Sequence, residues 1–346
     1  MIRDNFFGNP TAIELLEGLI SRERIPQTLL FEGPEGVGKA TLARRFAAEL
    51  VGKRDLIEQD DLSLPHNVET LAEREKLAPE KRNDDPFHLA SHPDFVTFAP
   101  EGPLRQISIH QMRTLKERAQ YGPLQGNRRV FLIDAVDRAN EQAANSLLKT
   151  LEEPPPYLII VLTAENPYDL LPTIRSRVVP IRLGRLSRDE MNAFVKSKAL
   201  DQTADRIALA AGCPGIAATL DLEKYRTRRE VMRVLLECSA GKSPFAAWAM
   251  QSEKLAQARS EKLEPYLKVL LLLLSDLLHL REGVSGIRNP DLEKPLVQLA
   301  QAVTFDWLRA AVSKTDELLG LLRRNVQKNI ALDAMVLELR NLAGAR

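Results

Sequence analysis

The stretch of residues 130–156 limits the fold of this chain more than any other. It reads VFLIDAVDRANEQAANSLLKTLEEPPP and opens with four consecutive apolar residues, which is typical of a buried parallel strand. An amphipathic helix is predicted over residues 140–153, because apolar residues recur on one face until three prolines end it. A second apolar strand, residues 158–162, follows at once. This order predicts a strand–helix–strand unit of a parallel sheet.

A glycine-rich loop lies nearer the N-terminus, after an apolar strand at residues 28–31. The loop reads GPEGVGKAT from Gly33 to Thr41, fits the pattern GxxxxGK, and leads into a predicted helix. Glycines allow backbone N–H groups to face phosphate oxygens, and the lysine neutralises the β- and γ-phosphates. Asp134 ends the strand at residues 130–133, where parallel sheets place ligand sites. The predicted nucleotide-binding residues are therefore Gly33, Gly36, Gly38, Lys39, Thr41 and Asp134.

The residue after the loop lysine departs from the motif. A Ser or Thr hydroxyl normally helps to hold Mg²⁺ there, and this chain has Ala40. Thr41 lies about 100° further round the helix, so it is not an equivalent ligand. Two interpretations stay open. Either the loop binds ATP or ADP without metal-assisted hydrolysis, or it keeps its shape without a nucleotide.

The run NSLLKTLEEPP at residues 145–155 is similar to the helix after the Walker B strand in the clamp-loader branch of AAA+ proteins. It resembles in particular the gamma/tau and delta-prime subunits of the bacterial DNA polymerase III clamp loader. Active members of that family carry Asp-Glu at the end of the strand, whereas this chain has Asp134-Ala135. Alanine cannot polarise an attacking water molecule. The resemblance also puts Glu165 at or near the first sensor position and Gly215 where an arginine contacts the nucleotide.

Ser176-Arg177-Val178 resembles the Ser-Arg-Cys motif of the same family, with the cysteine replaced. In that family the arginine reaches the ATP of a neighbouring subunit and stabilises charge in the transition state. The resemblance thus implies that Arg177 is an arginine finger that acts in trans. The alternative is an arginine that only forms a surface salt bridge.

Residues 52–91 differ in character from the rest of the chain. Acidic residues outnumber basic ones, and no aromatic residue appears before Phe87. The resembling family commonly has a zinc module with four cysteines at this place, and this stretch contains no cysteine. We therefore expect no zinc, and a solvated, partly mobile insertion.

The remaining residues are predicted to be helical. Ser187 and Glu190 form a capping-box pattern after a last strand at residues 179–183. Leucine-rich helices are predicted over residues 266–280, 297–308, 315–326 and 330–342. The expected organisation is an α/β AAA+ P-loop domain with a parallel sheet (1–183), a small helical lid (184–240) and an all-α collar for oligomerisation (241–346).

Composition sets limits on partners and location. The formal net charge is +1, so the whole chain has no strong electrostatic attraction to nucleic acid. Two cysteines far apart in sequence suit a reducing compartment. The apolar run at residues 269–274 is much too short for a membrane span, and the N-terminal residues lack the apolar segment of a signal peptide. We expect a cytoplasmic protein without membrane contact.

Two functional hypotheses follow from the resemblance. The first is a non-hydrolysing stator subunit of the delta-prime type, within the DNA polymerase III holoenzyme. It would join gamma/tau and delta in a hetero-pentamer that loads the sliding clamp on primer-template DNA. The alternative is a catalytically active ATPase of the gamma/tau type. Replacements that each remove a group needed for hydrolysis favour the first hypothesis, and they lie at Ala40, Ala135, Glu165 and Gly215.

Overall fold

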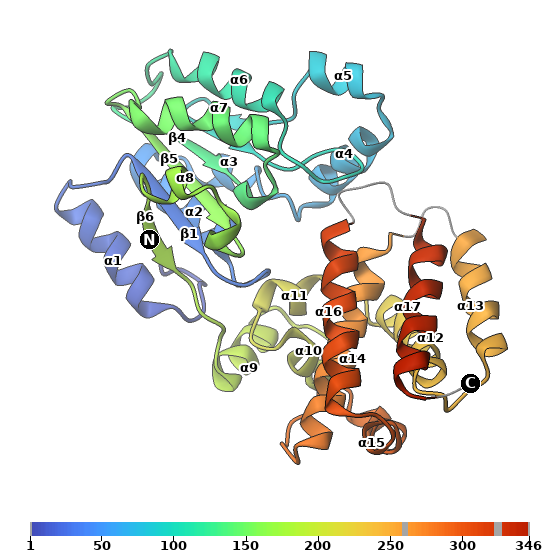
Figure 1. The fold of residues 1–346 in the computed structure, drawn as a ribbon. Coiled ribbons are helices and arrows are strands. Elements are labelled where there is room, and N and C mark those ends of the chain that lie inside the picture. The colour runs from blue at the N-terminus through green and yellow to red at the C-terminus, as the bar shows by residue number, and fades with distance from the viewer. Residues whose placement is uncertain (1, 258–261, 322–326, 345–346) are drawn as a thin grey trace. The chain divides into compact units, whose positions relative to one another are not determined.

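The computed structural model describes residues 2–257, 262–321 and 327–344 (Figure 1). The chain divides into two compact units. The α/β unit comprises Met1–Ala199 and Gly212–Ala218, and the helical unit comprises Leu200–Ala211 and Thr219–Arg346. The helices expected to form a lid are shared between these units. The separate lid domain therefore stays a prediction.

A six-stranded sheet forms the centre of the α/β unit, in the order β2-β3-β4-β5-β1-β6. All neighbouring strands pair in parallel except β2 and β3, which are antiparallel. The strands are β1 (Thr28–Glu32), β2 (Leu89–His92), β3 (Phe95–Phe98), β4 (Arg129–Ile133), β5 (Leu158–Ala164) and β6 (Val179–Arg182). The predicted strand–helix–strand unit is confirmed as β4, the intervening helix and β5.

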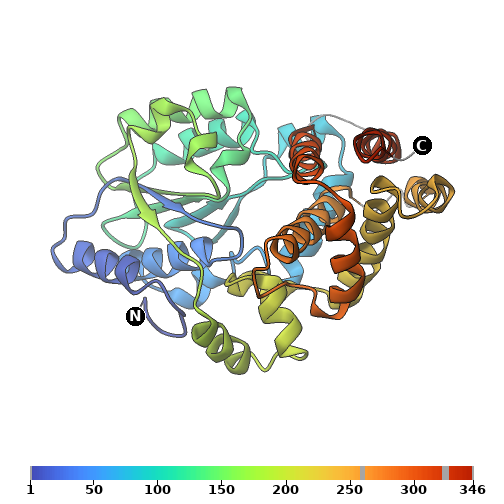
Figure 2. The same ribbon diagram turned by 60° about the horizontal axis from the view of Figure 1, so that its bottom comes forward.

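Helices cover both faces of this sheet (Figures 1 and 2). The helices of the α/β unit are α1 (Pro10–Ser21), α2 (Lys39–Val51), α3 (Arg54–Glu58), α4 (Pro65–Lys76), α5 (Pro79–Asp84), α6 (Ile109–Ala119), α7 (Glu141–Glu152), α8 (Pro172–Arg175), α9 (Arg188–Ser197) and α11 (Pro214–Thr219). Alternate residues of β1 show the two layers: Leu29 and Phe31 share one core with α1 and α2, and Leu30 shares the other with α6 and α7.

The helix starts in this unit follow the capping chemistry of the sequence. Ser108 caps α6, and its side chain accepts a hydrogen bond from the backbone of Gln111. Ser187 and Glu190 form the predicted capping box at the start of α9. Asn140 caps α7 in the same way, through the backbone N–H of Ala143.

Residues 52–91 are more regular than their composition indicates, because α3, α4 and α5 occupy most of the stretch. Many of their side chains are exposed, as expected, and the partial mobility of the stretch stays a prediction. Arg44, which is 2% exposed, forms ion pairs with Glu58 and Asp61. Arg74 forms a 2.6 Å ion pair with Glu101, and both side chains are almost completely buried. Sequence reasoning missed these pairs because the partners lie far apart along the chain.

The helical unit surrounds its own core, which includes Trp248 and Trp307. Its helices are α10 (Thr203–Ala210), α12 (Leu222–Ser239), α13 (Phe245–Gln257), α14 (Glu264–Arg281), α15 (Glu293–Ala302), α16 (Phe305–Leu321) and α17 (Lys328–Leu342). The helices predicted over 297–308 and 315–326 have the wrong bounds. Helix α15 ends at Ala302 and α16 begins at Phe305. The Thr304 hydroxyl, just before α16, accepts a hydrogen bond from the backbone N–H of Trp307. Residues 322–326 of the second predicted helix lie outside the described residues.

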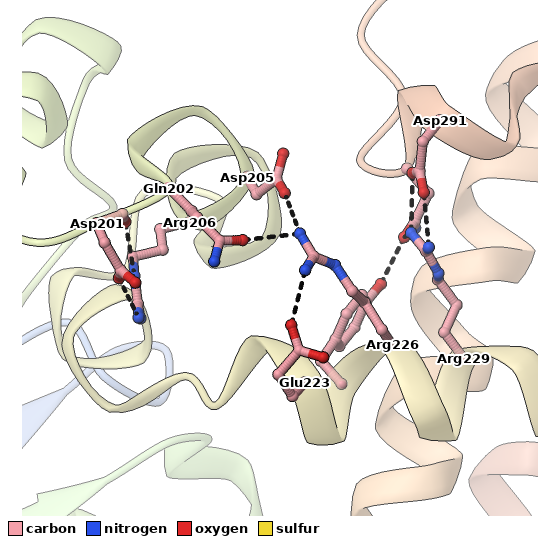
Figure 3. A network of polar contacts seen from close by, with 10 residues as sticks. Asp201, Gln202, Asp205, Arg206, Glu223, Arg226, Arg229 and Asp291 are labelled. Carbon is pink, nitrogen blue, oxygen red and sulfur yellow. Dashed lines mark hydrogen bonds and ion pairs between the residues drawn. The ribbon is translucent and has the colours of Figure 1, made fainter.

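Ion pairs connect segments of the helical unit (Figure 3). Arg226 on α12 donates to Asp205 on α10, to Gln202 and to Glu223. On the next turn of α12, Arg229 binds Asp291 through both terminal nitrogens. Within the described ranges, no helix has both the length and the apolar character that a membrane span requires.

We expect Glu101→Ala to lower the free energy of unfolding of the α/β unit by about 3 kcal/mol, because it leaves the buried Arg74 guanidinium without its main partner. Urea unfolding measures the change, and limited proteolysis should show new cleavage within residues 52–91. Glu73→Ala on the exposed side of α4 is the control. Equal stability and equal proteolysis of the two variants would contradict the role of this pair.

Candidate functional site

The glycine-rich loop joins the end of β1 to the start of α2, as the sequence predicts. Lys39 is the first residue of α2 and is 9% exposed. Its Nζ donates hydrogen bonds to the carbonyl oxygens of Gly33 (2.7 Å) and Pro34 (2.8 Å). Burial lowers the pKa of Lys39, and the carboxylates of Glu165 and Asp134 act in the opposite direction. An ammonium group has three N–H donors, and the two carbonyl oxygens use two of them.

The first turn of α11 packs directly on the loop. Gly36 has a φ of 74°, and its carbonyl oxygen accepts a 2.7 Å hydrogen bond from the backbone N–H of Gly215. A Cβ atom at position 215 would lie 2.9 Å from that oxygen and 3.0 Å from the Cα of Gly36. The two segments can approach this closely only because position 215 has no side chain. Cys213 in the same turn is buried, as expected.

Asp134 lies at the same edge of the sheet, beyond the end of β4. Its Oδ1 accepts a hydrogen bond from the Thr163 hydroxyl, which in turn accepts one from the backbone N–H of Ala135. Burial raises the pKa of Asp137, whose Oδ2 accepts a hydrogen bond from the backbone of Glu165. Sequence reasoning did not identify Thr163 as the partner of Asp134. The polar side chain of Thr163 near the end of an otherwise apolar strand was the signal that could have identified this residue.

The residues at this edge include groups that can contact phosphate, and alanine stands at two positions where the resembling family has groups for hydrolysis. The structure brings Lys39 and Asp134 together, and Thr41 occupies the first turn of α2. Neither Ala40 nor Ala135 can hold a metal ion or activate water. Among the residues that the structure describes, no group of three or more His, Cys, Asp or Glu side chains is arranged to hold a metal ion.

Arg177 lies at the opposite edge of the sheet. The Thr28 hydroxyl, at the first residue of β1, donates a hydrogen bond to the Arg177 carbonyl oxygen. Gly33, the first residue of the glycine-rich loop, follows Thr28 by five residues, which is about 16 Å along an extended strand at 3.3 Å per residue. This distance exceeds the length of an arginine side chain. The Arg177 side chain therefore does not extend to the start of its own loop.

The Arg177 guanidinium is held in one orientation and is partly exposed. Nη1 donates to the carbonyl oxygen of Thr173 (2.9 Å) and to the Ser176 hydroxyl (3.2 Å). Nη2 forms a 2.9 Å ion pair with Glu152, and the Arg177 side chain is 35% exposed. Arg177 thus forms a surface salt bridge and keeps part of its side chain exposed, and the two alternatives for this residue stay open.

Two family models match this chain. Residues 8–187 match a model described as DNA polymerase III, delta subunit. Residues 225–340 match a model described as DNA polymerase III, delta subunit, C terminal. The two matches together include nearly all of both structural units.

Individual relatives carry related names. The Escherichia coli "DNA polymerase III subunit delta'" is 30% identical over 65% of this chain and 66% of its own length. The Pseudomonas aeruginosa protein of the same name is 28% identical over 63% of each chain. A Mycobacterium bovis "DNA polymerase III subunit gamma/tau" is 33% identical over 46% of this chain, and only 25% of its own length is matched. Less than two thirds of each relative is thus covered.

Among solved structures, a gamma subunit-related protein of Thermotoga maritima aligns with 95% of this chain and 99% of its own, with a TM-score of 0.45 and 20% identity. The family models and the named relatives carry the assignment. The chain belongs to the DNA polymerase III delta subunit family.

Proposed function

We propose that this chain is the non-hydrolysing stator of a DNA polymerase III clamp loader. It joins gamma/tau and delta subunits in a hetero-pentamer that loads the sliding clamp on primer-template DNA, and it supplies Arg177 to the ATP of the adjacent subunit. One observation carries the proposal. Arg177 is accessible and oriented, but it lies at the edge of the sheet opposite its own phosphate-binding loop.

The state of the chain's own loop supports the stator over an active ATPase of the gamma/tau type. Ala40 and Ala135 remove the metal-binding hydroxyl and the water-polarising carboxylate. The Gly215 turn is hydrogen-bonded to Gly36, where an arginine side chain does not fit without a shift of the backbone. A working motor is difficult to reconcile with these replacements together.

The same residues limit the cofactors. We propose that ATP or ADP, if it binds, binds without hydrolysis, held by the loop N–H groups and Lys39. We propose also that residues 52–91 hold no zinc, because ion pairs around Arg44 and Arg74 anchor them instead. Cytoplasmic location remains part of the proposal and rests on the proposed partners.

The isolated protein should not hydrolyse ATP above the rate of a buffer control, because the groups that activate water and hold Mg²⁺ are missing. A phosphate-release assay with an isolated gamma/tau subunit as positive control measures this. Turnover near that of gamma/tau, abolished by Lys39→Ala, would show that the chain is an active ATPase.

Gly215→Ala should destabilise the α/β unit by about 1–3 kcal/mol, since the added methyl group overlaps the Gly36 backbone. Gly122→Ala is the matched control, because a Cβ there meets nothing within 4 Å. Thermal unfolding of both variants against the wild type gives the comparison. If Gly215→Ala is as stable as Gly122→Ala, the close packing of the two backbones is not required.

Arg177→Ala should leave assembly with gamma/tau and delta intact but remove DNA-stimulated hydrolysis at one site, where arginine fingers contribute on the order of 10³ to 10⁵ in rate. Size-exclusion chromatography checks the stoichiometric complex, and steady-state ATPase with primed DNA measures the loss. Arg188→Ala, an exposed arginine on α9, serves as the control. Full hydrolysis by the Arg177→Ala complex would contradict the proposed role of Arg177 as an arginine finger. Failure of the wild-type chain to assemble with gamma/tau and delta would contradict the proposed stator role.

A further inference from the structure

We infer that Glu152 is a positioning residue for Arg177, and that it sets the direction in which the guanidinium is presented to an anionic group on another chain. The inference rests on the proposed role of Arg177, and the anion is then the terminal phosphate of the neighbour's nucleotide. Glu152 is the last residue of α7, and its Oε1 lies 2.9 Å from Arg177 Nη2.

The backbones that carry this pair are fixed by two consecutive residues. The Gln27 side chain donates to the carbonyl oxygens of Pro154 (3.3 Å) and Pro155 (2.8 Å), just after the end of α7. The Thr28 hydroxyl donates to the carbonyl oxygen of Arg177. Gln27 and Thr28 are adjacent at the start of β1. The segment after Glu152 and the backbone of Arg177 are therefore both hydrogen-bonded to the same end of this strand.

The contacts of Arg177 leave part of its guanidinium available. Arginine has five N–H donors, and within the described residues three of them contact the Thr173 carbonyl, the Ser176 hydroxyl and Glu152. The Nε–H and one N–H of Nη2 are then available to the oxygens of an anion such as a phosphate. With the side chain already oriented, less rotamer entropy is lost when the anion is contacted.

The exposure of the pair separates positioning from folding. The side chains of Glu152 and Arg177 are 48% and 35% exposed, so the ion pair contributes little to the stability of the unit. Substitution of Glu152 should therefore leave the fold and the assembly unchanged, while the guanidinium becomes free to sample other rotamers. An effect on rate without an effect on stability distinguishes the two roles.

The experiment measures DNA-stimulated ATPase of the complex reconstituted with gamma/tau and delta. The difference between wild type and Arg177→Ala defines the component that depends on Arg177. Glu152→Ala should lower this component about fivefold, the factor that corresponds to the upper range of an exposed ion pair. Glu152→Gln, which keeps an acceptor oxygen at the same place, should retain most of it.

Two controls make the result specific. Glu153→Gln removes the same charge at the adjacent exposed position and should behave as wild type. The reason is that, among the described residues, Glu152 and not Glu153 forms the ion pair with Arg177. In the double variant Glu152→Ala/Arg177→Ala the rate should be no lower than in Arg177→Ala alone, because Glu152 acts only through the arginine. Thermal unfolding and size-exclusion chromatography confirm an intact fold and complex.

The outcomes separate the inference from the proposed function. If Arg177→Ala lowers the rate but Glu152→Ala matches wild type or exceeds it, the positioning role of Glu152 is wrong and the arginine finger stands. A further loss in the double variant would also refute positioning through Arg177. If Arg177→Ala has no effect, both the inference and the proposed mechanism fail.

Discussion

The direction of one parallel strand controls the arrangement of this protein. β1 carries the glycine-rich loop at its C-terminal end and contacts the Arg177 backbone at its N-terminal end. In a parallel sheet, loops at the carboxyl ends of the strands gather at one edge, so Asp134 and Thr163 join the loop there. The helix α7 returns to the other edge and brings Glu152 beside Arg177. The glycine-rich loop and Arg177 are thereby separated by the length of a strand.

The absence of a side chain at position 215 controls the packing of the glycine-rich loop. Gly215 allows the first turn of α11 to approach Gly36 within hydrogen-bond distance. The Lys39 ammonium group donates hydrogen bonds to two carbonyl oxygens of the same loop. The loop keeps the shape of a phosphate site, but its contacts are those of a structural element.

Buried charge pairs hold the segment where the resembling family has a metal module. Arg74 and Glu101 are removed from water together, and each supplies the charge that the other needs in a medium of low dielectric constant. Glu101 also accepts a hydrogen bond from the backbone of Phe87, which ties the end of the segment to the same carboxylate. A stretch that composition describes as solvated is thus anchored by its own charged residues.

The sequence by itself determined the elements whose signals are local. The strand–helix–strand unit at residues 130–162, the glycine-rich loop and the caps at Ser108 and Ser187 all depend on neighbours within a few residues. Only the tertiary structure decided the rest, since it depends on residues far apart in the chain. The Arg74–Glu101 pair, the contact of Gly215 with Gly36 and the break between α15 and α16 leave no periodic pattern. The exposure and orientation of Arg177 likewise come from Thr28 and Glu152, which the fold alone brings to it.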